Sequence, residues 1–134
     1  MTLRRMPLLD VIDETFVVAP PSAVAAELKR PELWRRLFAD VECRAYEDRG
    51  DEGVRLTVTG ALVGTSEFWV EPWGDGAIVH YYLRADPARS LSPRKLIRAG
   101  ERHRVRLKAG LNELKDRLEA GRVVGMPLGE ASSR

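Results

Sequence analysis

The sequence predicts an α+β domain in which an antiparallel sheet packs against one long C-terminal helix. Three observations support this fold class. Residues 41–85 follow a two-residue period with short breaks rich in glycine and aspartate, as antiparallel strands do. Residues 93–120 keep one helical period throughout. The pair Pro20-Pro21 separates a strand-like start from two short helix-like segments.

The bulk composition limits the class of protein. With 134 residues, 44% hydrophobic and 31% charged, the chain is expected to form one globular domain. A net charge of +2 gives no general argument for nucleic acid or an anionic membrane. The lone Cys43 excludes an intrachain disulfide. We see no secretory signal or membrane span, so we expect a cytoplasmic protein without a transmembrane segment.

The N-terminal part is predicted to form a strand and two short helices. Leu9–Val18 alternates loosely and is rich in β-branched residues, which favour strands, and the following prolines end it. Ser22 is the predicted cap of the first helix, and Pro31 is predicted to begin the second. Residues 1–8 are expected to be flexible.

The middle of the chain is predicted to be an antiparallel meander. Its last break, WGDG at 73–76, closes a hairpin whose paired residue numbers sum to about 149. This register places Phe68 opposite Tyr81 on an apolar face, and Trp69 on the other face. The four predicted strands cover residues 41–48, 53–60, 64–72 and 77–85.

The last element is predicted to be one long helix. Ser92 as cap and Pro93 in the first helical position form its start, and Gly121 is expected to end it. The domain then spans 9–121, followed by a flexible tail at 122–134. The apolar stripe that faces the sheet consists of Leu96, Gly100, His103, Leu107, Leu111, Leu114 and Leu118.

The outer face of the predicted sheet mixes charges with aromatic residues, and two interpretations of it stay open. One is a partly solvated row of cross-strand pairs that stabilises the hairpin. The other is an interface, most simply of a symmetric homodimer, because tryptophan and tyrosine favour interfaces. The candidate interface residues are Trp69, Ile78, His80 and Tyr82.

The order β-α-α-β4-α resembles the helix-grip fold of the START/Bet v1-like (SRPBCC) superfamily, in particular its polyketide cyclase/dehydrase-like and lipid-transport-like members. Three stretches support the resemblance: IDETFVVAPPSAVAAELKRPELW as the opening, the hairpin EPWGDGAIVHYYL, and RHRVRLKAGLNELKDRLEAG as the closing helix. Together they span residues 9–121. The chain has fewer strands than family members usually place before the last helix, so we expect a shortened sheet and a smaller pocket.

The resemblance implies a cavity between the concave face of the sheet and the long helix. A packed core is the alternative, since an empty apolar void of about 300 Å³ would cost roughly 7 kcal/mol. By position, the resemblance assigns the lining of the cavity to Phe16, Val18, Leu56, Val58, Phe68, Val70, Tyr81, Leu83, Gly100, His103 and Leu107.

Three polar residues on predicted inner positions are candidates for chemistry. A neutral His103 can donate a hydrogen bond to a ligand or act as an acid or base, unless a backbone carbonyl satisfies it. Glu14, assigned to the same face as Phe16, needs a partner such as Arg55 or His103 if it is buried, unless the end of its strand is solvated. The hydroxyl of Tyr81 can face the pocket or belong to the core.

These observations leave three hypotheses of function. The first is a binding or carrier domain for a small hydrophobic molecule, lipid or polyketide-like. The second is an enzyme of the polyketide cyclase/aromatase type that uses His103, Tyr81 and Glu14. The third is an interaction module that dimerises through the outer face. His80 and His103 are the only histidines and no metal-ligand spacing occurs, so no metal or other cofactor is expected.

A run of basic residues precedes and enters the long helix. The apolar stripe interrupts it and no aromatic residues are interleaved, so it is interpreted as a solvated helix face and no nucleic-acid partner is expected. The run comprises Arg89, Arg94, Lys95, Arg98, Arg102, Arg104, Arg106 and Lys108.

Overall fold

The computed structural model describes residues 6–120, and it confirms the predicted α+β class with one five-stranded antiparallel sheet. The expected flexible segments at 1–8 and 122–134 lie outside the described residues, apart from residues 6–8. Within the described part, no helix has the length and apolar character needed to cross a bilayer. The elements are β1 (Leu9–Val17), α1 (Pro21–Leu28), α2 (Pro31–Leu37), β2 (Val41–Asp48), η1 (Gly50–Glu52), β3 (Gly53–Gly60), β4 (Leu62–Trp73), β5 (Gly76–Pro87) and α3 (Pro93–Glu119).

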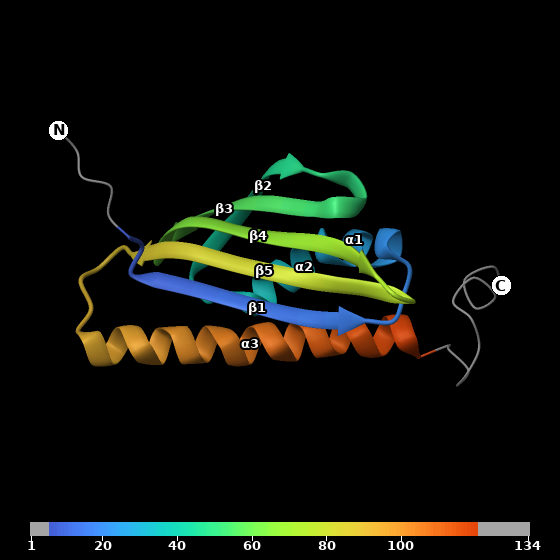
Figure 1. The fold of residues 1–134 in the computed structure, drawn as a ribbon. Coiled ribbons are helices and arrows are strands. Elements are labelled where there is room, and N and C mark those ends of the chain that lie inside the picture. The colour runs from blue at the N-terminus through green and yellow to red at the C-terminus, as the bar shows by residue number, and fades with distance from the viewer. Residues whose placement is uncertain (1–5, 121–134) are drawn as a thin grey trace.

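The strands lie in the order β1-β5-β4-β3-β2, so β1 and β2 form the two edges. Figure 1 shows α3 running beside β1 along nearly its whole length, with α1 and α2 behind the sheet. The predicted hairpin register is confirmed, since Phe68 pairs with Tyr81. The pairing continues to Trp73 and Gly76, which leaves a two-residue turn. Gly74 takes a φ of 53° in this turn, a conformation that glycine adopts at little cost.

The two predicted helix caps have different outcomes. The Ser92 cap of α3 is confirmed, because its hydroxyl accepts a hydrogen bond from the Lys95 N–H at 3.3 Å. The Ser22 cap of α1 is wrong: the helix begins at Pro21, two residues before the start that a Ser22 cap implies, and it has no side-chain cap. Proline is favourable in this first position because its φ is already helical and it has no N–H to satisfy.

The inner face of the sheet forms one continuous core with the helices. The predicted inner residues of β3, β4 and β5 are all buried, and Phe68, Tyr81 and Leu56 are fully inaccessible, at 0% exposed. Helix α2 adds Trp34, whose Nε1–H donates to the carbonyl oxygen of Leu28 at 2.8 Å. Helix α3 contributes buried leucines, which confirms the central part of its predicted stripe: Leu107, Leu111 and Leu114.

The predicted orientation of the first strand is wrong by one residue. In β1, Val11, Thr15 and Val17 face the core, whereas Phe16 is 37% exposed and Glu14 is also on the outer side. The strand has apolar residues in both phases, so its own pattern does not decide between them. The pairing with β5 decides, because it places the inward residues of β1 beside the inward residues of β5.

The free edge of β1 is covered by side chains from α3. The Nζ of Lys108 donates to Asp13 Oδ2 at 2.9 Å and to Thr15 Oγ1 at 3.0 Å. The Nζ of Lys115 donates to the carbonyl oxygen of Phe16 at 2.8 Å. Just beyond the strand, the Val18 N–H donates to Glu119 Oε2 at 2.8 Å. These contacts satisfy polar groups that an edge strand otherwise presents to other chains.

Candidate functional site

The centre of the domain is a packed core. The ring centroids of Phe68 and Tyr81 lie 5.0 Å apart, and those of Tyr81 and His103 lie 5.6 Å apart. Most of the side chains that the resemblance assigned to a cavity therefore fill the space between sheet and helix. These residues are Leu56, Val58, Phe68, Val70, Tyr81 and Leu107, all at most 1% exposed.

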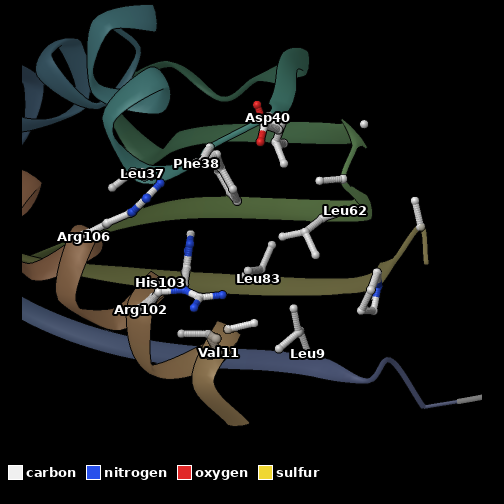
Figure 2. A pocket seen from close by; sticks show the side chains of 18 of the residues that line it. Leu9, Val11, Leu37, Phe38, Asp40, Leu62, Leu83, Arg102, His103 and Arg106 are labelled. Carbon is white, nitrogen blue, oxygen red and sulfur yellow. The ribbon is translucent and has the colours of Figure 1, made fainter. Parts of the chain in front are cut away.

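A pocket of about 680 Å³ lies at one end of this core, and we call it the end pocket. It is bordered by the start of β1, the α2–β2 connection, the β3–β4 turn, the end of β5 and the first half of α3 (Figure 2). Of the predicted lining residues, only Leu83, Gly100 and His103 border it. The larger aliphatic and aromatic side chains that line it are Leu9, Val11, Leu37, Phe38, Val41, Leu62, Leu83 and Leu91.

The spacing between α3 and its neighbours explains why the pocket lies at this end. A Cβ on Gly110 would come within 3.0 Å of Leu33 Cδ1, so the helix packs tightly against α2 there. A Cβ on Gly100 would find its nearest neighbour, Leu9 Cδ2, at 3.8 Å. Gly100 and Leu96 are only half-buried, whereas His103 and Leu107 are buried. The first turns of α3 thus leave room beside the sheet.

His103, which borders the end pocket, forms a buried polar pair with Tyr81 in the core behind it. The Tyr81 hydroxyl lies 2.7 Å from His103 Nε2, and the His103 ring centroid lies 4.7 Å from that of Phe38. Burial lowers the pKa of His103 to about 4, against a smaller opposing effect from a backbone hydrogen bond with Leu37. The imidazole is therefore neutral at pH 7. Its partners assign the proton to Nδ1, donating to Leu37, while Nε2 accepts from Tyr81.

The Tyr81 hydroxyl is not available as an acid or base in this arrangement, because it is hydrogen-bonded to His103 Nε2. Burial raises the pKa of Tyr81, which keeps the phenol protonated. The neighbouring Ser66 hydroxyl lowers that pKa slightly, although Ser66 Oγ makes no hydrogen bond of normal geometry within the described residues. Tyr81 and His103 satisfy each other, so the His103 ring that borders the pocket is held in place from the core side.

Glu14, the third candidate for catalysis, lies on the opposite face of the sheet. Its Oε1 is 3.5 Å from Nδ1 of His80, whose Nε2 is 2.9 Å from Glu71 Oε1. The structure therefore does not bring Glu14 together with His103 and Tyr81. Phe16 and Val18 also lie outside the end pocket, because the predicted inward phase of the first strand was wrong.

The predicted outer-face residues do lie together on the side of the sheet that faces away from the core. The rings of Trp69 and His80 stack with centroids 4.3 Å apart. Trp69, Tyr82 and Ile78 are half-buried, and His80 is buried. Glu67 beside them is ion-paired with Arg49 at 2.9 Å and with Arg55 at 3.3 Å. Charged side chains therefore flank this aromatic row.

Sequence reasoning missed the charged border of the end pocket. Arg89, Arg102 and Arg106 line it together with Asp40, whose backbone has a φ of 56° and whose carbonyl accepts from the Ala61 N–H at 2.9 Å. The sequence assigned these arginines to a solvated run, and they are exposed as predicted, but the sequence did not place them beside a pocket. Whether they border a pocket depends on where α3 stands away from the sheet, and the sequence does not specify this. One clue is available in the sequence: α3 has no acidic residue in its first turn.

Comparison with solved structures identifies the fold. No family model and no curated protein matches the chain. The Aha1 dimer from Colwellia psychrerythraea is similar, with a TM-score of 0.60 at 11% identity, over 86% of this chain and 99% of that one. TTHA0849 from Thermus thermophilus has a TM-score of 0.55 at 19% identity, over 85% of this chain and 99% of that one. CalU16 from Micromonospora echinospora has a TM-score of 0.57 at 14% identity, over 92% of this chain and 81% of that one.

At these identities the similarity shows the fold alone. It confirms the helix-grip fold that the sequence resemblance implied, here with a five-stranded sheet in the described residues.

Proposed function

We propose that this helix-grip domain binds a small hydrophobic molecule, lipid-like or polyketide-like, in the end pocket. One observation carries the proposal: a pocket of about 680 Å³ with an apolar lining opens between the sheet and the first half of α3. Small-molecule sites usually occupy about 300–1,000 Å³ and are lined mainly by apolar side chains with a few polar groups. His103, held by its hydrogen bond with Tyr81, supplies such a polar group.

The geometry of this pair favours binding over catalysis. A general base must present a free acceptor near its substrate at the working pH. His103 Nε2 is already occupied by the Tyr81 hydroxyl, and Glu14 lies on the other side of the sheet. A carrier or binding role therefore suits these residues better than the polyketide cyclase-type role.

A homodimer through Trp69, Ile78, His80 and Tyr82 stays a prediction. Light scattering coupled to size-exclusion chromatography tests it, and Trp69→Ala is expected to shift a dimer towards monomer without changing ligand affinity. A monomer at high protein concentration would remove this hypothesis and leave the end pocket unaffected.

Narrowing the end pocket is expected to weaken the binding of an apolar probe. The neutral dye Nile red is titrated into the wild-type chain and into Gly100→Leu, whose added side chain would enter the space beside Leu9. We expect at least about 10-fold weaker binding, the effect of roughly 1.4 kcal/mol in lost contact. The measurement is the fluorescence increase of the dye.

Ala109→Leu is the control, because it places the same leucine side chain at an exposed position of the same helix, outside the pocket. Its dye affinity is expected to equal that of the wild type. Equal affinity in Gly100→Leu and Ala109→Leu, with both proteins folded, would contradict the proposed binding site.

A further inference from the structure

We propose that the ligand of the end pocket carries a carboxylate, which Arg102 and Arg106 bind at the mouth while a single apolar chain occupies the interior. This inference rests on the proposed function and narrows it to one class of ligand, a fatty-acid-like monoanion. The two arginines stand one helical turn apart on α3, so both can reach the same small group. Figure 2 shows both extending from α3 along the same side of the pocket, with Asp40 and Leu62 across from them.

The charge around the pocket is positive and unpaired. Arg89, Arg102 and Arg106 line it against one carboxylate, that of Asp40. Within residues 6–120, none of these three arginines forms an ion pair with an acidic side chain. His103 adds no charge at neutral pH. The mouth therefore presents guanidinium groups whose donors are available to a planar carboxylate.

Several arginines elsewhere in the fold form ion pairs with acids, whereas the described arginines on the first half of α3 form none. Arg49 binds Glu67, Arg117 binds Glu27 at 2.9 Å, and Arg36 binds Glu113. Between residues 93 and 112, by contrast, α3 carries seven lysines or arginines and one acid, Glu101. The first turn of a helix favours acids because of the helix dipole, so this charge distribution has a local cost. Departures from local preference concentrate at functional sites.

The surroundings favour a singly charged head and one chain. Apolar side chains line the interior. A ligand with charges along its whole length would lose hydration there without gaining polar partners. Asp40 at the border opposes a second negative charge, which disfavours a phosphate monoester relative to a carboxylate. The volume of about 680 Å³ suits a single small molecule.

A set of ligands with the same chain tests the head group. Calorimetry at pH 7.5 and low salt compares dodecanoate, dodecanol, dodecyl phosphate and dodecyltrimethylammonium with the wild-type chain, each below its micelle concentration. Dodecanoate is expected to bind about 10-fold or more tightly than dodecanol, the gain of a charge-assisted contact. Added salt should weaken dodecanoate binding and leave dodecanol binding unchanged.

Two variants assign the effect to the arginines. Arg102→Gln and Arg106→Gln are each expected to weaken dodecanoate binding about 10-fold and to leave dodecanol binding unchanged. Arg104→Gln is the matched control: it removes the same charge from the same helix segment but does not line the end pocket. It should retain nearly all of the wild-type preference for dodecanoate. Circular dichroism confirms that each variant is folded.

The outcomes separate this inference from the proposed function. If dodecanol and dodecanoate bind equally, or if Arg104→Gln has the same effect as Arg102→Gln and Arg106→Gln, the carboxylate site is refuted while the apolar pocket stands. If dodecyl phosphate binds tightest, the head group is a phosphate and the carboxylate proposal is wrong. If none of the four compounds binds, both the inference and the proposed function fail.

Discussion

Replacing Phe68 with alanine is expected to lower the free energy of unfolding by about 3–5 kcal/mol. Phe68 is 0% exposed at the centre of the inner face, and its ring centroid lies 5.0 Å from that of Tyr81. The substitution removes the ring from a packed core whose neighbours cannot fully close the space. Urea unfolding followed by circular dichroism measures the effect. Because the loss is a large part of a typical domain stability of about 5–15 kcal/mol, Phe68→Leu provides a milder second variant.

Phe16→Ala is the matched control for this prediction. Phe16 is 37% exposed on the outer side of β1, with Lys115 Nζ 6.0 Å from its ring centroid. We expect a loss of about 1 kcal/mol or less. If Phe16→Ala cost as much as Phe68→Ala, or if Phe68→Leu had no effect, the assignment of inner and outer faces would be wrong.

Acidification is expected to destabilise the domain through His103. The pKa of this imidazole is lowered to about 4 in the fold from its ordinary value of 6.5, because burial disfavours the charged form. Between these values the unfolded state binds more protons than the folded state, so stability falls as the pH falls. Above about pH 6.5, His103 is neutral in both states and the free energy of unfolding keeps its full value. As the pH falls towards 4, on the order of 3 kcal/mol of that free energy is lost.

The comparison of two histidine variants isolates this effect. Urea unfolding is measured from pH 7.5 to pH 4.5 for the wild type, His103→Gln and His80→Gln. His103→Gln is expected to be less stable at pH 7.5, because it disturbs the contact with Tyr81, but to lose much less stability on acidification. His80→Gln removes the other histidine, so the pH dependence that persists in this variant comes from groups other than His80. A parallel pH dependence in the wild type and His103→Gln would contradict a buried, neutral His103.

The elements that the sequence predicts well are those fixed by local chemistry. The hairpin register follows from the WGDG turn, because the glycine at position 74 allows a two-residue connection. That register settles the faces of β4 and β5. The start of α3 follows from Ser92 and Pro93, and its central stripe follows from the helical period.

The elements that the sequence could not specify depend on contacts between distant segments. The phase of β1 depends on pairing with β5, about 70 residues away. The position of the pocket depends on where α3 stands away from the sheet, and this in turn depends on packing against α2 at Gly110. For this reason His103 was identified from its place on the apolar stripe, whereas Arg102 and Arg106, which are exposed as predicted, were not recognised as residues that border a pocket.

The most direct test of the account is an NMR titration of the full chain with dodecanol, a neutral probe that does not depend on the arginines. If the end pocket is the binding site, backbone amide shifts will concentrate at residues 38–41, 60–62, 83 and 99–103. Shifts confined to the outer face around Trp69 and Tyr82, or no saturable shifts at all, would contradict the account.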